Sequence, residues 1–282
     1  MLVFTLEEDL INHLSTQKKN GKTLGFVPTM GALHLGHLSL IEKSSLENNL
    51  TVVSIFVNPI QFNNPSDLKN YPRTLDEDLI AIKSVNPNTI VFTPSEKSIF
   101  KDKTTSLKFN FKGLDQYMEG SSRPGHFNGV GTIVHILFNI VKPNNAYFGK
   151  KDYQQLLIIK QVNQQFKHQI NIIGCPIYRE THGLAMSSRN ERLSAIARQK
   201  SSIIYDCLKT IHQEFSKKSI PELKILAENI FEKHPEFKLE YLEICNADTL
   251  KPVKRKNNAT KYRAFIAVEI ENIRLIDNIS VN

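Results

Sequence analysis

The stretch from Leu24 to Asn48 constrains the fold more than any other part of the sequence. Its first four residues, Leu24 to Val27, form an apolar run suited to a buried strand, and its later apolar residues recur at roughly helical spacing. Pro28-Thr29-Met30-Gly31 between them is a turn signal. A strand, a glycine-bearing turn and a helix leave unpaired main-chain N–H groups at the carboxyl end of a sheet, where anions bind. The stretch therefore predicts an anion site.

Two histidines stand at the start of the predicted helix. His34 and His37 are three residues apart, so they project onto one face, and Gly36 between them leaves space for a phosphate to approach the main chain. A surface or capping role is the plainer interpretation of such histidines. A metal site is less favoured, because zinc-binding helices commonly space their histidines four apart with a glutamate between them, and none lies here. We predict phosphate contacts and no metal ligands.

The composition is that of a globular protein with a basic surface. The 282 residues provide for one large domain or two of ordinary size. The formal net charge of +8, with a pI near 9.2, suits polyanionic substrates or nucleic acid. No arginine-rich helix, aromatic RNA-binding motif or Cys/His finger is visible in the sequence. We therefore expect no nucleic-acid partner.

The cysteines and the N-terminal residues indicate the cellular compartment. Cys175, Cys207 and Cys245 are odd in number and far apart, which argues for a reducing compartment without a disulfide framework. The acidic residues at positions 7–9 do not fit a secretory signal. No apolar run approaches the roughly 20 residues that a membrane span needs. We expect a cytoplasmic protein with no membrane partner.

The first hundred residues continue the pattern of strands and helices. We expect a helix over 5–18, capped by Thr5 with Glu8 completing a capping box. A second buried strand covers 50–57 and ends in the loop 58–62, and a helix over 75–84 precedes a third strand over 89–92. The acids at positions 76–78 are interpreted as helix N-terminal residues favoured by the helix dipole, with a magnesium role as the minor alternative.

The middle of the chain repeats the strand, glycine and helix order. A loop rich in glycine and proline over 121–129 leads into an apolar helix over 130–141, and strands follow over 145–148 and 170–173. Between these strands, Lys151 is placed to meet a phosphate, Asp152 a ribose hydroxyl, and Gln155 lies one turn on from Lys151. The alternation of strands and helices predicts an α/β fold with a mostly parallel sheet.

A second group of phosphate donors follows the fifth predicted strand. Ser187, Ser188 and Arg189 come shortly after Gly183, and an arginine beside two hydroxyls suits bidentate contacts to phosphate oxygens. A helix N-cap is the competing interpretation of the serines, and the pattern alone does not decide between the two.

The composition changes after residue 190. Amphipathic helices are expected over 193–215 and 221–234, and strands over 237–244 and 263–270. We divide the chain into an α/β domain over 1–180 and a smaller α+β domain over 181–282 that covers the active site. The basic run 251–261 is interpreted as a solvated turn, with anion steering as the alternative.

Six stretches taken together resemble one known family. They are PTMGALHLGH at 28–37, FVNPIQF at 56–62, YPRT at 71–74, RPGHFNGV at 123–130, FGKKDYQQ at 148–155 and GLAMSSRN at 183–190. In this order and spacing they resemble the pantothenate synthetases (pantoate–β-alanine ligases), a family of the HxGH nucleotidyltransferase superfamily. Two positions depart from the family pattern. Asn128 is at a variable position, and His182 stands where the family commonly has aspartate.

The resemblance implies a fold and a reaction. It implies a Rossmann-like N-terminal domain that binds nucleotide and pantoate. It further implies the ATP-dependent condensation of pantoate with β-alanine through pantoyl adenylate, with release of AMP and pyrophosphate, as a step of pantothenate and coenzyme A biosynthesis. ATP is then a substrate, Mg²⁺ bridges its phosphates, and the enzyme is expected to be a homodimer in which the apolar strand over 50–57 could contribute to the interface.

The resemblance also implies site residues. The catalytic residues are His34, His37, Lys151 and Arg189. The ATP-binding residues are Met30, Gly31, Ala32, Leu33, His34, Leu35, Gly36, His37, Gly149, Lys150, Lys151, Asp152, Tyr178, Met186, Ser187, Ser188 and Arg189. Pantoate and β-alanine are expected to bind at Gln61, Gln155, Asn58, Tyr71 and Arg123. Two alternatives are kept: an adenylyltransferase that leaves the adenylyl group on phosphopantetheine or nicotinamide mononucleotide, and a basic RNA-binding protein.

Overall fold

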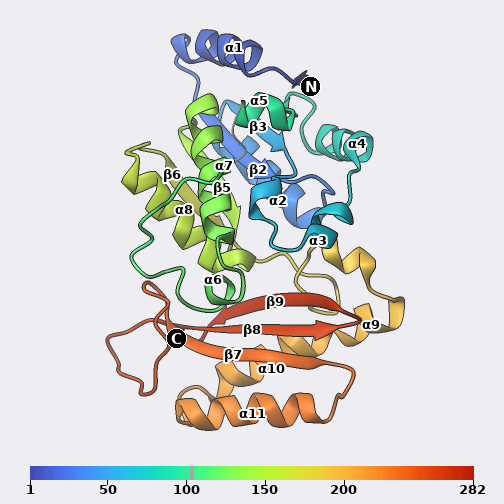
Figure 1. Cartoon of the computed structure of the whole chain (residues 1–282), viewed down its shortest axis with the longest axis vertical. Coiled ribbons are helices and arrows are strands. Elements are labelled where there is room, and N and C mark those ends of the chain that lie inside the picture. Colours follow the sequence, from blue (N-terminus) through green and yellow to red (C-terminus); the bar gives the residue numbers. More distant parts are fainter. Residues whose placement is uncertain (102–104) are drawn as a thin grey trace. The chain divides into compact units, whose positions relative to one another are not determined.

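The computed structural model describes residues 1–101 and 105–282, which form two compact units (Figure 1). The first unit consists of Met1–Lys112, Arg123–Lys150 and Gln155–Pro176, and the second of Gly113–Ser122, Lys151–Gln154 and Ile177–Asn282. The second unit thus contains two short segments from the first 180 residues, in addition to the C-terminal part of the chain.

The first unit is built on a parallel sheet, as the alternation of strands and helices predicts. Its six strands have the spatial order β1-β4-β3-β2-β5-β6. They are β1 (Leu2–Phe4), β2 (Leu24–Thr29), β3 (Leu50–Ile55), β4 (Ile90–Phe92), β5 (Asn145–Gly149) and β6 (Asn171–Cys175). The helices are α1 (Glu7–Lys19), α2 (Leu35–Glu47), α3 (Pro65–Lys69), α4 (Leu75–Val85), α5 (Glu96–Phe100), α7 (His126–Val141) and α8 (Tyr153–Gln165), with 3₁₀ turns η1 (Pro59–Gln61) and η2 (Lys150–Asp152).

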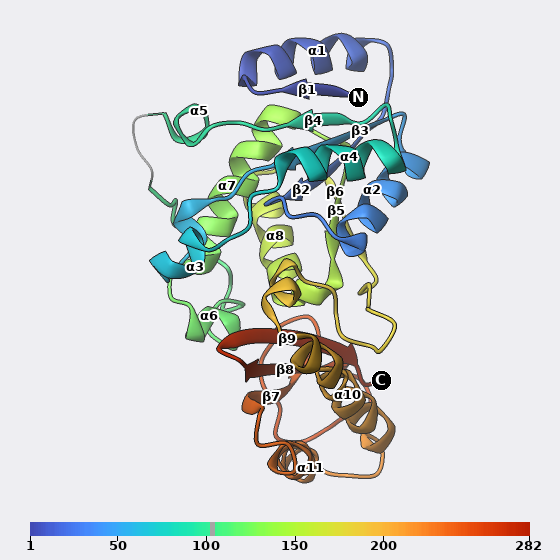
Figure 2. The same cartoon turned by 90° about the vertical axis from the view of Figure 1, so that its right-hand side faces the viewer.

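Both faces of this sheet are covered by helices, which explains why its central strands are apolar at nearly every position. Val27 and Val53 face α2 and α4, where Ile41 and Ile82 are fully buried. These two helices also contact each other (Figure 2). On the opposite face, Phe26 packs edge-on against Phe138 of α7, with ring centroids 6.3 Å apart.

The first unit differs from the sequence-based expectations in one strand and one helix cap. Strand β1 was not predicted, because a three-residue edge strand with mostly exposed side chains has no alternating pattern to detect. Helix α1 begins at Glu7 after Leu6, so Thr5 is not its cap and no side chain caps it. Strand β3 pairs with β2 on one side and β4 on the other, so it is interior to the sheet. The contribution of this strand and its flanks to a dimer interface stays a prediction.

The second unit combines a small antiparallel sheet with helices. Strands β7 (Lys238–Asn246), β8 (Tyr262–Ile270) and β9 (Ile273–Ser280) pair in that order, and helices α10 (Ser202–Glu214) and α11 (Ile220–Glu232) pack on one face over a shared apolar core. The unit also contains α6 (Glu119–Ser122), the 3₁₀ turn η3 (Ser188–Arg192) and α9 (Ala195–Lys200). The α+β class of this part of the chain is confirmed.

Strand β9 was not predicted from the sequence. It follows β8 through a two-residue turn in which Glu271 and Asn272 have φ values of 51° and 59°. Positive φ at both central residues defines a type I′ hairpin turn, in which asparagine is favoured. Glu-Asn between two apolar runs was the available signal.

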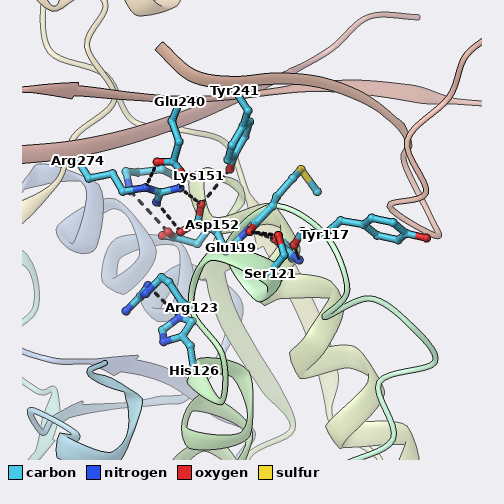
Figure 3. Close-up of polar contacts among 12 residues, drawn as sticks. Tyr117, Glu119, Ser121, Arg123, His126, Lys151, Asp152, Glu240, Tyr241 and Arg274 are labelled. Atoms are coloured by element: carbon cyan, nitrogen blue, oxygen red, sulfur yellow. Dashed lines mark hydrogen bonds and ion pairs between the residues drawn. The ribbon is translucent and has the colours of Figure 1, made fainter. Parts of the chain in front are cut away.

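The segments Gly113–Ser122 and Lys151–Gln154 are held against the sheet of the second unit. Both carboxylate oxygens of Glu119 accept hydrogen bonds from Arg274 of β9 at 2.7 Å, and one also accepts from the Tyr241 hydroxyl at 2.9 Å (Figure 3). The side-chain amide of Gln154 donates to the carbonyls of Leu114 and Tyr117, both at 2.8 Å. The two segments are therefore fixed to the sheet and to each other.

Candidate active site

The order of the strands reverses direction between β2 and β5, two adjacent interior strands of the sheet. From β2 the chain continues outward through β3 to β4, and it then returns to the other side of β2 to form β5 and β6. At such a reversal, the connections after the two central strands lie on opposite faces of the sheet and leave a crevice between them. The turn after β2 carries His34 and His37, and Gly149 ends β5, so the strand order brings the first and fifth of the six stretches to one edge of the sheet.

The turn after β2 has a strained main chain that is held from within. Gly31 and Ala32 have φ values of 79° and 49°, in the left-handed region. The hydroxyl of Thr29 accepts a hydrogen bond from the N–H of Gly31 at 3.2 Å and donates to the carbonyl of Ser54 at 2.7 Å. A Cβ at position 31 would lie 3.0 Å from the Asp78 carboxylate, so glycine is needed there for space as well as for conformation.

Asp78 of α4 holds this turn. Its two carboxylate oxygens accept hydrogen bonds from the main-chain N–H groups of Ala32 at 3.0 Å and Leu33 at 2.7 Å. Burial raises the pKa of Asp78, and the hydrogen bonds from Leu33 and Ala32 oppose that rise. The expectation that these N–H groups are unpaired and bind an anion is therefore wrong for residues 32 and 33. Asp78 is therefore not only an acid favoured by the helix dipole, because it also binds the main chain of the turn after β2.

His34 and His37 lie together, as their spacing predicts. Their rings stack with centroids 4.0 Å apart and planes 28° apart. His34 precedes the first residue of α2, and its main-chain N–H donates to Nδ1 of His37 at 3.3 Å. The capping interpretation thus describes part of their role. Because Nδ1 of His37 accepts a hydrogen bond, the neutral ring carries its hydrogen on Nε2, where it can serve as a hydrogen-bond donor.

Gln61 is fixed by neighbours that come from three different segments. Its side-chain amide donates to the sulfur of Met30 at 2.9 Å and accepts from the amide of Asn58 at 2.9 Å. Asn58 also donates to the carbonyl of Gly129 on α7 at 3.1 Å. A Cβ at Gly129 would lie 2.4 Å from the carbonyl oxygen of Ile60, so this glycine allows α7 to pack directly on the turn that carries Gln61.

The loop 123–126 contacts the same turn. His126 is bonded through Nδ1 to the carbonyl of Gln61 at 2.8 Å, and its Nε2 faces the guanidinium of Arg123 at 3.1 Å (Figure 3). Arg123 also donates to the Gln61 carbonyl at 3.4 Å. Since a carbonyl only accepts, His126 has its hydrogen on Nδ1 and receives the Arg123 N–H on Nε2. Two stretches roughly 60 residues apart in sequence therefore form one structure around Gln61.

Tyr71 belongs to the same unit, where its side chain packs in the apolar interior. It is buried, and its ring meets that of Phe62 edge to face with centroids 5.6 Å apart. The residues before it include the short helix α3, which is capped by the side chain of Asn64. The structure thus places Tyr71 beside Phe62, the residue that follows the turn of Gln61.

The residues after β5 divide between the two units. Gly149 and Lys150 belong to the first unit. Among the described residues, apart from its two chain neighbours, no atom would lie within 4 Å of a Cβ at Gly149, so space is open beside it. Lys151 and Asp152 belong to the second unit, where the ammonium of Lys151 is 3.5 Å from the Asp152 carboxylate. Gln155, in the first turn of α8, belongs to the first unit.

The loop that carries the serines and Arg189 is a tightly bonded hairpin in the second unit. Met186 donates its N–H to the carbonyl of Tyr178 at 3.0 Å, and Asn190 donates to the Glu180 carboxylate at 2.7 Å. The hydroxyl of Ser187 accepts from the main-chain N–H of Arg189 at 3.3 Å and caps η3. The capping interpretation of Ser187 is therefore correct in the structure. His182 is bonded to the carbonyl of Arg198 at 2.9 Å.

Each unit thus carries one set of the predicted site residues. The first holds Met30, Gly31, Ala32, Leu33, His34, Leu35, Gly36, His37, Asn58, Gln61, Tyr71, Arg123, Gly149, Lys150 and Gln155. The second holds Lys151, Asp152, Tyr178, Met186, Ser187, Ser188 and Arg189. Leu35 is half exposed, whereas Leu33 packs against the apolar core beside α2.

Sequence reasoning missed three residues that shape these sets. Asp78 could have been found, because it lies four residues before the buried Ile82, so a charged side chain falls on the apolar face of α4. His126 is part of a quoted motif but was given no role. Arg179, whose guanidinium forms a two-point ion pair with Asp277 at 2.5 and 3.0 Å, gave no signal in the sequence.

Neither a metal centre nor a membrane span is found among the described residues. Across 1–101 and 105–282, no three histidine, cysteine, aspartate or glutamate side chains converge as metal ligands. No helix in this part of the chain has both the length and the apolar character needed to cross a membrane.

Comparisons with known proteins place the chain beside a single enzyme family. A protein-family model described as pantoate-beta-alanine ligase matches residues 3–280. Pantothenate synthetase of Flavobacterium psychrophilum is 52% identical over 281 residues, and that of Christiangramia forsetii 45% over 282 residues, with 100% of each chain covered.

Solved structures give the same picture. Pantothenate synthetase from Thermus thermophilus aligns with a TM-score of 0.91 at 35% identity, covering 100% of this chain and 99% of that one. Pantoate-beta-alanine ligase from Francisella tularensis, complexed with beta-gamma ATP and beta-alanine, aligns with a TM-score of 0.77 at 36% identity, covering 100% of this chain and 98% of that one.

Proposed function

The chain belongs to the pantoate–β-alanine ligase family, and we propose from its residues how it carries out the ligation. The enzyme joins pantoate to β-alanine and consumes ATP. A carboxylate oxygen of pantoate attacks the α-phosphorus, the bond to pyrophosphate breaks, and pantoyl adenylate forms. The amine of β-alanine then attacks the acyl carbon, AMP leaves, and the nitrogen loses a proton to give pantothenate. The family match over residues 3–280 carries this assignment.

The protein contributes charge and position rather than covalent chemistry. We assign the phosphate contacts to His34, His37, Lys151, Ser187, Ser188 and Arg189. The bond from the His34 N–H to Nδ1 of His37 supports the role of His37, because it leaves Nε2–H to donate as charge grows on the phosphates. Arginine adds a planar fork for two phosphate oxygens.

The rest of the nucleotide is assigned to residues of both units. Asp152 binds the ribose, and the main chain at Met30 to Leu33, Leu35, Gly36, Gly149, Lys150, Tyr178 and Met186 lines the nucleotide. Because the N–H groups of Ala32 and Leu33 donate to Asp78, these two residues line the nucleotide through van der Waals contact and do not donate hydrogen bonds to it. The open space beside Gly149 supports a close approach of the nucleotide to that main chain.

Pantoate is assigned to Gln61 and Gln155, whose neutral amides can bind its hydroxyl and carboxyl groups without quenching the nucleophile. Asn58 is 1% exposed, and its Oδ1 has no hydrogen-bond partner among the described residues, which suits an N–H or O–H group of a substrate. Arg123 and Tyr71 complete the substrate assignments. The hydrogen bonds that Gln61 accepts from Asn58 and donates to Met30 support this set, because they hold the Gln61 amide in one orientation.

Three further assignments belong to the same proposal. Mg²⁺ enters with ATP, because Mg²⁺ commonly keeps phosphates and waters as ligands, and no protein cage of three ligand side chains is found in the described ranges. The reaction takes place in the cytoplasm, a location that the three free, buried cysteines fit. The active form is a homodimer, which light scattering of the purified protein tests directly.

The experiment that tests the function separates the two steps. The protein is mixed with ATP, Mg²⁺ and pantoate, and pyrophosphate and AMP are followed with and without β-alanine. We expect pyrophosphate limited to about one equivalent per site without β-alanine, because the adenylate stays bound, and continuous release of both products with it. If a well-folded protein forms no pantoate-dependent pyrophosphate, the ligase assignment is wrong. A product that retains the adenylyl group would instead indicate an adenylyltransferase.

A further inference from the structure

Two neighbouring residues of β9 hold two segments that carry proposed ATP contacts. Successive side chains of a strand point to opposite faces of its sheet, so Asp277 and Asn278 face different sides. Asp277 lies on the side of α10, where it pairs with Arg179. Asn278 lies on the side of the segment Lys151–Gln154. Both side chains are buried, at 4% and 2% exposure.

The contacts of Asp277 fix the base of the hairpin that leads to Ser187. Its carboxylate forms the two-point pair with Arg179, at 2.5 and 3.0 Å. The same guanidinium lies 3.6 Å from the ring centroid of Tyr205 and donates to the carbonyl of Gly183 at 3.1 Å. A carboxylate, an aromatic face and a carbonyl thus restrain Arg179 from three directions.

The contacts of Asn278 fix the main chain at Lys151. Its side-chain amide donates to the carbonyl of Lys151 at 2.8 Å, and its Oδ1 accepts from Arg263 at 2.5 Å. The orientation of this amide is unambiguous, because a carbonyl can only accept and a guanidinium can only donate. Arg263 is itself stacked over the ring of Tyr153, 4.2 Å from its centroid.

The direction of the Lys151 side chain depends on this contact. Lys151 lies in the 3₁₀ turn η2 between a strand and a helix, and fixing its carbonyl sets the plane of the peptide that follows its Cα. We infer that Asn278 is a positioning residue for ATP binding, acting through Lys151. The inference rests on the proposed function, since it takes from that proposal the contact between Lys151 and the phosphates.

A double-mutant cycle tests the inference on the full chain. Wild type, Asn278→Ala, Lys151→Ala and the double variant are compared by pantoate-dependent exchange of labelled pyrophosphate into ATP, with kcat and KM for ATP measured for each. We expect Asn278→Ala to lower kcat/KM for ATP by about 10-fold to 100-fold, since small misplacements of a contact have effects of this size. In the Lys151→Ala background the same change should cost less than about threefold, because residues that act together are not additive.

Two further variants separate the bonds of Asn278 from general damage. Asn278→Asp keeps an acceptor for Arg263 but loses the donor to Lys151, so it should be impaired as Asn278→Ala is. The matched control is Asn282→Ala. The Asn282 amide also makes one bond of each kind, donating to the carbonyl of Thr260 at 2.8 Å and accepting from the N–H of Tyr262 at 2.7 Å. Its KM for ATP should equal that of the wild type.

The outcomes distinguish this inference from the proposed function. If wild type shows no pantoate-dependent exchange, the function itself is wrong. If wild type is active and Lys151→Ala is impaired while Asn278→Ala retains normal kinetics, only the positioning role is overturned. The role is also overturned if the effects of Asn278→Ala and Lys151→Ala are additive, or if Asn278→Asp retains the KM of the wild type for ATP. The role is supported if Asn278→Ala lowers kcat/KM for ATP in the wild-type background but has little effect in the Lys151→Ala background, while Asn282→Ala keeps the KM of the wild type for ATP.

Discussion

The carboxylate of Asp78 accepts a hydrogen bond from the main-chain N–H of Leu33 at 2.7 Å. This bond connects α4 to the turn that precedes the two histidines. The second oxygen of the same carboxylate accepts a hydrogen bond from the main-chain N–H of Ala32. A turn with positive φ at two consecutive residues is costly to maintain, and a buried acceptor that satisfies both N–H groups stabilises it. The position of His34 and His37 therefore depends on a residue 45 positions further along the chain than Leu33.

Asp78→Asn should lower the free energy of unfolding and raise KM for ATP. The carboxamide offers one acceptor and turns its NH₂ toward the second N–H, which leaves a buried donor unsatisfied at a cost of about 1–3 kcal/mol. Urea unfolding gives the loss of stability, and steady-state kinetics should show a raised KM for ATP. Asp76→Asn, an exposed acid in the same helical turn, is the control. Equal effects of the two substitutions would contradict a specific role for Asp78.

His37→Ala should lower turnover by roughly 10²–10³-fold, the usual effect of removing one preorganised donor to a developing charge. The expected loss is in kcat for adenylation, measured by pantoate-dependent pyrophosphate exchange. Circular dichroism and thermal unfolding establish that the fold is intact. A loss below about threefold in a folded variant would remove His37 from the mechanism.

Gly129→Ala should impair the use of pantoate. The added Cβ would meet the carbonyl of Ile60 at 2.4 Å and Cα of Gln61 at 2.8 Å, so the main chain that carries Gln61 has to move. We expect KM for pantoate to rise by about tenfold or more, because displacement of a positioned contact by even about 1 Å is costly.

The matched control for this substitution is Gly131→Ala, on the same helix. There the three atoms nearest to the added Cβ all belong to the ring of Phe109, the closest at 2.9 Å, and a side chain can turn away where a main chain cannot. Both variants are expected to lose stability in urea. A raised KM for pantoate in Gly131→Ala as well would show that damage to α7 in general, rather than displacement of Gln61, causes the effect.

The stability of the first unit should fall as the pH drops below about 7. His135 and His168 share a hydrogen bond of 3.0 Å between Nδ1 and Nε2, and burial lowers the pKa of both rings, that of His168 also through the charge of His135. With the folded pKa below the unfolded value near 6.5, the unfolded chain binds more protons in this range. Stability is therefore highest with both rings neutral and is lost as pH falls.

Urea unfolding at pH values from about 5.5 to 8 measures this dependence, and the His168→Gln variant identifies its source. The variant should show a shallower fall of the unfolding free energy with decreasing pH, because one of the two proton-binding rings is gone. An identical slope in variant and wild type would assign the acid sensitivity to other groups.

The sequence was informative wherever the chemistry is local. His34 and His37 stack because His34 is the N-cap of α2 and His37 lies three positions further on, in its first turn. The succession of strand, turn and helix predicts the parallel sheet. The predicted pairing of fold classes, α/β first and α+β second, also follows from patterns within short windows. Strands β1 and β9 were missed because a short exposed edge and a two-residue turn leave little signal in such windows.

The amino-acid sequence alone established which residue types stand after each strand, and with them the family and its chemistry. The partners that hold those residues in place became known only from the folded chain. Leu33 depends on Asp78, Gln61 on His126 and Lys151 on Asn278, across separations of 45, 65 and 127 residues. Such pairs arise because a buried hydrogen-bonding group takes whichever partner the packed strands and helices bring to it, and no local pattern in the chain records that choice.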